Sequence, residues 1–173
     1  MDAFIEILKY TFPAALMLLL TYMLLSNFVD NEENRRVFYL RKDLQKKALP
    51  MRMQAFERVI MLLERITPNH LVIRVKPGSM SLGTYRRTLV QAVRQEYDYN
   101  LTQQVYLSDE SWNHVVSAKS QVISLINKVA GTLEEDASAS DLAKELLNAE
   151  IAAEIFPTKA AILLIKHEAA RSF

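Results

Sequence analysis

The chain of 173 residues can form one domain, or one small domain with an appended segment, because domains usually take about 100–200 residues. Its 21 Lys and Arg residues face 20 Asp and Glu residues, so the formal net charge of +1 does not indicate a dedicated nucleic-acid binder. The absence of cysteine excludes disulfides, Cys-ligated metals and thiol nucleophiles, while only three glycines and five prolines favour an all-α fold.

The segment from residue 10 to 29, YTFPAALMLLLTYMLLSNFV, carries no formal charge. A helix of this length rises about 30 Å, which matches the hydrocarbon thickness of a bilayer. The acidic leader and the lack of a small-x-small cleavage site do not fit a signal peptide. The sequence therefore predicts a transmembrane anchor over residues 1–29; a buried or interfacial helix and a cleaved signal are the alternatives.

Residues 30–49 contain no Gly or Pro, so the helix is predicted to continue as a juxtamembrane stalk. The stalk is rich in basic residues, which are predicted to contact lipid headgroups or a partner. They are Arg35, Arg36, Arg41, Lys42, Lys46 and Lys47. By the positive-inside rule, this side of the span is cytoplasmic and the N-terminus is outside.

Val37, Leu40 and Leu44 form one apolar seam along the predicted stalk. Spacings of three and four residues place them on one helix face. The seam is compatible with packing on the chain's own domain and with self-association, because so short a repeat does not establish a coiled coil.

The region 50–173 is predicted to be a cytoplasmic helical domain. Turn signals and apolar periodicity predict helices over 51–66, 82–99, 109–133, 141–156 and 157–173. Pro50 is expected to open the first of them, and serines before 82 and at 108 are expected to cap the next two. Residues 69–76 are expected to be an extended linker or a helical turn, since a lone strand has no pairing partner.

The predicted core faces of three helices follow helical spacing. In the first helix they are Phe56, Val59, Ile60, Leu63 and Ile66; in the second, Leu82, Tyr85, Leu89, Ala92, Val93 and Glu96; in the third, Trp112, Val115, Val116, Val122, Ile126, Val129 and Leu133.

A second basic cluster lies on the helix predicted over 82–99. Between residues 74 and 94 there are five basic residues and no acid, and Arg86, Arg87 and Arg94 are the predicted lipid or partner contacts. Residues 132–156 are acidic, with seven acids and one lysine. These two stretches either face each other, within one chain or between copies, or are both solvated faces.

No motif for catalysis, a cofactor or a metal is present in the sequence. His70, His114 and His167 are far apart and match no metal-binding spacing, and no phosphate-binding loop or nucleophile elbow occurs. Carboxylate pairs such as Glu57 with Glu64 are routine on exposed helices. The chain is therefore predicted to be a non-enzyme with no cofactor.

The segments LPMRMQAFERVIMLLERITPNHLVIRV and NLTQQVYLSDESWNHV are similar to a known family. The chain resembles a family of uncharacterised single-span membrane proteins of Bacteroidota over most of its length. The resemblance implies a bacterial inner-membrane anchor with a helical domain, and it implies no activity.

These features predict a membrane-anchored scaffold or accessory subunit of an inner-membrane assembly. Its expected partners are the lipid bilayer and other subunits of that assembly. A second copy of the chain is a further expected partner, through the apolar seam of the stalk. The alternative is a membrane-tethered regulatory domain that binds lipid, nucleotide or RNA through the basic helix face. Nucleic acid is disfavoured because residues from 53 onward carry 13 basic and 14 acidic side chains.

Overall fold

The computed structural model describes residues 2–134 and 136–172, apart from a number of side chains before residue 48. The chain divides into two compact units, residues 1–49 and residues 50–173. The helices that position the candidate site all lie in the second unit.

The first helix, α1 (Asp2–Arg65), supplies the first unit and the start of the second. A new helix was predicted to open at Pro50, but that residue lies inside α1. The preference of proline for a first turn does not require a break, because the residues before Pro50 are good helix formers. The end of the helix was predicted correctly: the Thr67 hydroxyl donates to the Glu64 carbonyl at 2.6 Å, and Pro68 begins the next helix.

Among the residues that the structure describes, no helix combines the length and the apolar character needed to cross a membrane. This finding contradicts the transmembrane anchor predicted over residues 1–29, and with it the single-pass topology and the inner-membrane location. The side chains of Tyr10, Thr11 and residues 13–15 lie outside the described residues.

The predicted stalk, residues 30–49, is part of α1. Of its apolar seam, Leu40 is exposed, whereas the side chains of Val37 and Leu44 lie outside the described residues. Self-association through this seam therefore stays a prediction.

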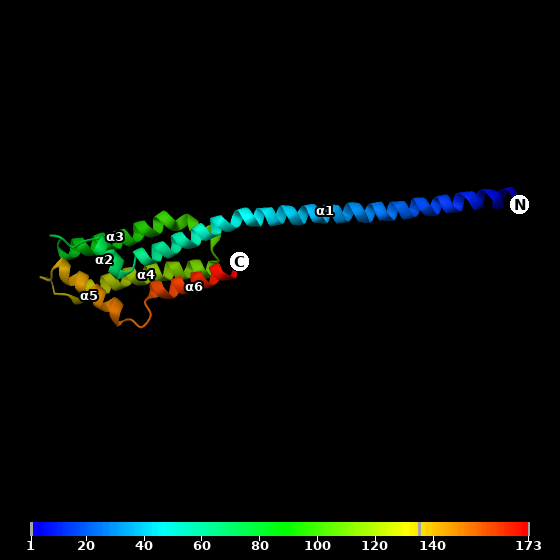
Figure 1. Cartoon of the computed structure of the whole chain (residues 1–173). Helices are drawn as coiled ribbons and strands as arrows, with labels where there is room; N and C mark the ends of the chain where they lie inside the picture. The colour runs from blue at the N-terminus through cyan, green and yellow to red at the C-terminus, as the bar shows by residue number, and fades with distance from the viewer. Residues whose placement is uncertain (1, 135, 173) are drawn as a thin grey trace. The chain divides into compact units, whose positions relative to one another are not determined.

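The second unit is a bundle of helices (Figure 1). After the last turns of α1 come α2 (Pro68–Arg74), α3 (Leu82–Asn100), a 3-10 helix η1 (Leu101–Tyr106), α4 (Asp109–Thr132), α5 (Ala139–Ala152) and α6 (Pro157–Arg171). Helix α4 packs against α3, α5 and α6, while α2 packs against α3 and α5. The all-helical part of the prediction is thus confirmed for the described residues, in which the only β-pairing is an isolated bridge between Ser81 and Ser138.

Serine side chains cap three of these helices. The hydroxyls of Ser81, Ser108 and Ser138 accept hydrogen bonds from the backbone N–H groups of Thr84, Ser111 and Asp141. A capping serine satisfies one of the N–H groups that a helix start leaves without a partner, and each such cap contributes about 1 kcal/mol. The starts of α3 and α4 are consequently fixed where the sequence predicted them.

A single hydrophobic core joins the helices of the second unit. Most of the predicted core positions are fully buried: Phe56, Val59, Leu63, Ile66, Tyr85, Leu89, Val93, Val115, Val122 and Ile126. Ile60, Val116 and Val129 are only partly buried at its edge. Helical periodicity therefore identified the buried faces correctly, but the predicted faces also included residues at their edges that are only partly buried.

Of two connections, one agrees with the prediction and one differs from it. Residues 69–76 are mostly the short helix α2, one of the two forms expected for this stretch. Helix α5 ends at Ala152, four residues before the predicted end at Phe156. The residue before a proline is disfavoured in the helical region, and Phe156, which precedes Pro157, adopts an extended conformation with its ring buried.

Replacing Tyr85 with Phe tests how α3 is fixed against the α2–α3 connection. The buried Tyr85 hydroxyl donates to the Val75 carbonyl at 2.9 Å. Its loss leaves that carbonyl without this partner, so Tyr85→Phe is expected to reduce the free energy of unfolding by about 1 kcal/mol in urea titrations at neutral pH. Tyr99→Phe, at an exposed ring, is the matched control and should change little. Equal stabilities of the Tyr85→Phe variant and the wild type would contradict this role.

The same tyrosine makes stability depend on alkaline pH. Burial raises the pKa of Tyr85 from 10.0 to about 12. Above pH 10 the unfolded chain loses this proton more readily than the folded one, so the contribution of Tyr85 is complete below pH 10 and is lost as the pH rises through 12. Tyr85→Phe should remove this part of the alkaline loss of stability, whereas Tyr99→Phe should keep it.

Candidate anion-binding groove

Helix α3 presents its basic side chains outward because its apolar side chains are held in the core. Tyr85, Leu89 and Val93 are completely buried and recur every four residues. Arg86 lies next to this buried stripe, Arg87 and Arg94 lie farther round the helix, and all three are exposed. The burial of one face of α3 therefore fixes the direction of all three arginines.

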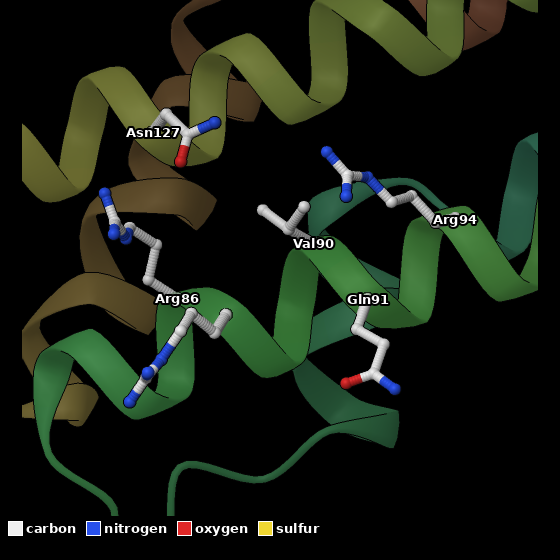
Figure 2. A pocket seen from close by; sticks show the side chains of 6 residues that line it. Arg86, Val90, Gln91, Arg94 and Asn127 are labelled. Carbon is white, nitrogen blue, oxygen red and sulfur yellow. The ribbon is translucent and has the colours of Figure 1, made fainter.

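A groove of about 380 Å³ lies between α3 and α4. Its lining comes from α3, except for one residue of α4: Arg86, Arg87, Val90, Gln91, Arg94 and Asn127. Figure 2 shows Val90 and Arg94 projecting toward the helix that carries Asn127, whereas Gln91 points away from it. The structure thus brings together the three arginines that the sequence predicted as contacts, and adds an amide from a second helix.

Sequence reasoning missed Val90, Gln91 and Asn127. Val90 follows Arg86 and precedes Arg94 by four residues, so helical spacing alone could have placed it between them. No local signal identifies Asn127, because it reaches the groove only through the packing of α4 against α3.

The positive charge of the groove is not neutralised by the described part of the chain. Neither residues 82–95 of α3 nor residues 111–132 of α4 include an acid. No side-chain hydrogen bond or ion pair joins Arg86, Arg94 or Asn127 to another residue that the structure describes. Arg87 donates only to its own helix, to the Gly83 carbonyl at 3.3 Å and the Thr84 hydroxyl at 3.4 Å.

Two other arginines of this unit, Arg65 and Arg74, are paired. Arg65 and Arg74 both bind the Glu96 carboxylate, at 2.9 and 2.6 Å. Glu96 follows Arg94 by two residues on α3, yet its carboxylate is held by arginines of α1 and α2. The nearest acid in sequence is therefore already engaged away from the groove.

The aromatic side chains near the basic helix face are engaged elsewhere. The rings of Tyr97 and Trp112 lie 5.6 Å apart, centroid to centroid, and the Lys119 ammonium lies 3.8 Å above the Tyr97 ring. The groove lining itself contains no aromatic residue. The site therefore offers guanidinium and amide donors, and it has no ring on which a base could stack.

The six predicted contact residues of the stalk belong to the first unit, whereas the described lining of this groove belongs to the second. Arg35, Arg36, Lys42 and Lys46 are exposed. The side chains of Arg41 and Lys47 lie outside the described residues. Their predicted contact with lipid or protein is not tested by the structure.

The histidines show no metal geometry. His70 contacts the Glu64 carbonyl through Nδ1 at 2.9 Å and the Thr67 hydroxyl at 3.0 Å, so it stabilises the turn between α1 and α2. His114 and His167 are exposed. Among the residues that the structure describes, no cluster of three His, Asp or Glu could hold a metal ion.

A second pocket, of about 790 Å³, lies between the start of α4 and α6. Glu168 of α6 lies on its wall and accepts hydrogen bonds from the backbone N–H of Ser108 at 2.9 Å and from the Ser108 hydroxyl at 2.7 Å. Arg52 lies 3.9 Å from the same carboxylate. The Ser111 hydroxyl is buried beside it, without a partner in good hydrogen-bond geometry among the described residues.

Glu168 thus supplies the anion that the start of α4 favours. Burial acts to raise the pKa of this carboxyl, but the hydroxyls of Ser111 and Ser108, the Ser108 N–H and the charge of Arg52 outweigh burial. The pKa of Glu168 consequently lies below its usual range. This pocket contains its own counter-charge, in contrast to the groove between α3 and α4.

The chain belongs to a family of unknown function, DUF7935, whose model matches residues 2–172. The match supports the resemblance at the level of family membership, and it carries no statement about membranes or about Bacteroidota. The comparisons with curated proteins and with solved structures each gave no match.

Replacing Glu168 with Gln tests the link between α6 and α4. Gln keeps the shape of the side chain but removes the charge at the start of α4, so the free energy of unfolding should fall by about 1–2 kcal/mol at pH 7. Because the pKa of Glu168 is lowered, its contribution is present above the ordinary carboxyl pKa and is lost as the pH falls through the lowered value. The difference from wild type, measured by urea titration, should therefore shrink in acid. The exposed Glu57→Gln is the matched control; a deficit that stays constant down to strongly acidic pH would contradict the link.

Proposed function

We propose that residues 50–173 form a non-enzymatic binding module, a scaffold or accessory subunit of a protein assembly, which docks an acidic segment of a partner protein. The segment binds in the groove between α3 and α4. The observation that carries this proposal is the unneutralised charge of Arg86, Arg87 and Arg94 in a concave site.

Electrostatics favours an anionic partner at this groove. Three guanidinium groups within nine residues of one helix repel one another, and residues 82–95 and 111–132 of the two wall helices contain no acid to offset this repulsion. An acidic segment offsets it and steers encounter, because complementary charge raises association rates. A concave site also shields the ion pairs from solvent better than a flat surface does, which strengthens them.

The chemistry of the lining supports binding rather than catalysis at this groove. Arginine stays protonated above pH 12, and amides and valine exchange no protons near neutral pH. The lining residues therefore offer recognition without a general base or a nucleophile.

The second candidate function is a regulatory domain that binds a nucleotide or RNA through the same arginines. It shares the charge argument, but the lining contains no ring for a base, and Tyr97 already contacts Trp112 and Lys119. Recognition of single-stranded nucleic acid depends on stacking of this kind. The lining thus favours an acidic peptide over a nucleotide.

A charge-reversal experiment tests the docking site. The full chain with Arg86→Glu, Arg87→Glu and Arg94→Glu is compared with the wild type for binding of a fluorescent poly-glutamate peptide, measured by anisotropy. We expect binding of the peptide to be at least about tenfold weaker, because each arginine of the groove has been replaced by a glutamate that repels the peptide. The matched control makes the same change in net charge at exposed cations outside the lining, with Arg58→Glu, Lys159→Glu and Lys166→Glu.

The two triple variants separate local docking from overall charge. An equal loss in both variants, with folding verified by circular dichroism, would contradict a site in the groove. A single-stranded oligonucleotide of matched charge provides the second arm. If the wild type binds it more tightly than poly-glutamate, and the groove variant abolishes that binding, the regulatory alternative replaces the docking proposal.

A further inference from the structure

The groove contains more positive charge than a single carboxylate neutralises. Arg86, Arg87 and Arg94 supply three charges around about 380 Å³, whereas each Glu or Asp side chain of a partner brings one negative charge. A phosphomonoester carries about −1.5 to −2 charges at pH 7 and has three strong acceptor oxygens. The charge of the groove is therefore better matched by a phosphate group than by one carboxylate.

The donor geometry points to the same group. Arg86 and Arg94 lie eight residues apart, about 12 Å along the helix, with Val90 midway between them. Figure 2 shows Val90 and Arg94 on the side of α3 that faces Asn127. Two long side chains from the ends and one amide from the opposite helix can converge on a group with three acceptor oxygens.

Arginine is better suited than lysine to binding a phosphate group. Its planar guanidinium presents paired N–H donors that bind phosphate in a bidentate manner, whereas lysine acts as a point charge. All three cations of the lining are arginines. Val90 is half-buried, and it offers an apolar contact for the carbon atoms of a short side chain that carries the phosphate.

We infer that the groove between α3 and α4 binds a phosphorylated serine or threonine within the acidic segment of the partner, with the phosphate between Arg86, Arg94 and Asn127. This inference rests on the proposed function, and it adds the chemical group that the groove selects. Arg87, which is already bonded to Gly83 and Thr84 of its own helix, contributes charge at the edge.

The test uses three degenerate peptide mixtures that differ only at a fixed central residue, which is phosphoserine, glutamate or serine. Degenerate flanks make the result independent of any one sequence context. Retention by the immobilised full chain is expected to be at least about tenfold greater for phosphoserine than for glutamate, and greater for glutamate than for serine. Inorganic phosphate, used as a competitor, should release the phosphoserine mixture.

Charge-conserving variants separate phosphate recognition from simple attraction. Arg86→Lys with Arg94→Lys keeps the net charge and removes the guanidinium forks, so the preference for phosphoserine over glutamate should fall to about twofold or less. Asn127→Asp should weaken phosphoserine retention by about tenfold through repulsion, whereas Asn113→Asp, at an exposed position of the same helix, should not.

The outcomes distinguish this inference from the function on which it rests. Equal retention of the phosphoserine and glutamate mixtures overturns the phosphate inference but leaves docking of an acidic segment intact. Retention that is the same for all three mixtures and is unchanged by Arg86→Glu, Arg87→Glu and Arg94→Glu overturns both. A preference for phosphoserine that survives the two Arg→Lys changes shows that charge alone acts, and it also overturns the bidentate site.

Discussion

The burial of α4 is the constraint on which the rest of the second unit depends. Val115, Val122 and Ile126 are almost completely buried along this helix, which packs against α3, α5 and α6. A helix enclosed on several sides cannot shift without opening a cavity, and core cavities cost about 2–5 kcal/mol for a large side chain. The position of Asn127 at the groove, and of Ser108 and Ser111 at the α6 junction, follows from this fixed helix.

Charge is distributed over this frame in two different ways. Glu96 binds Arg65 and Arg74, and Glu168 binds Ser108 near Arg52, so these acids stabilise junctions between helices. The basic face of α3 has no such internal partner among the described residues. Self-repulsion of a cluster weakens a fold slightly, and the fold tolerates it here because Tyr85, Leu89 and Val93 hold the same helix in the core.

The elements and their buried faces could be predicted from the sequence where local physics decides them. Serine caps, prolines and helical spacing located α3, α4 and α6 to within a residue or two. The start at Pro50 was wrong because a proline preference is not a break, and the end of α5 was wrong because periodicity continued past the true end at Ala152. The transmembrane prediction rested on the uncharged run and the charges that flank it, and it is contradicted because no described helix is long and apolar enough to cross a membrane.

The candidate site could be predicted only in part, because local sequence patterns group residues of one helix but not residues of different helices. Arg86, Arg87 and Arg94 share one helix, so sequence spacing alone grouped them. Asn127 and the pairing of Glu168 with Ser108 join residues that are far apart in the chain, and only tertiary packing brings them together.

The contrast between the two pockets indicates which one is available to a ligand. The start of α4 attracts anions, but the Glu168 carboxylate of α6 already occupies that position. Because the pKa of Glu168 is lowered, this carboxylate stays negatively charged and repels a second anion. The groove between α3 and α4 is smaller, yet no described acid fills it. An external anion at the larger pocket must displace an internal one that stabilises the fold, whereas at the groove it relieves repulsion among arginines. The proposed binding site is therefore chosen by the absence of an internal counter-charge and not by the size of the pocket.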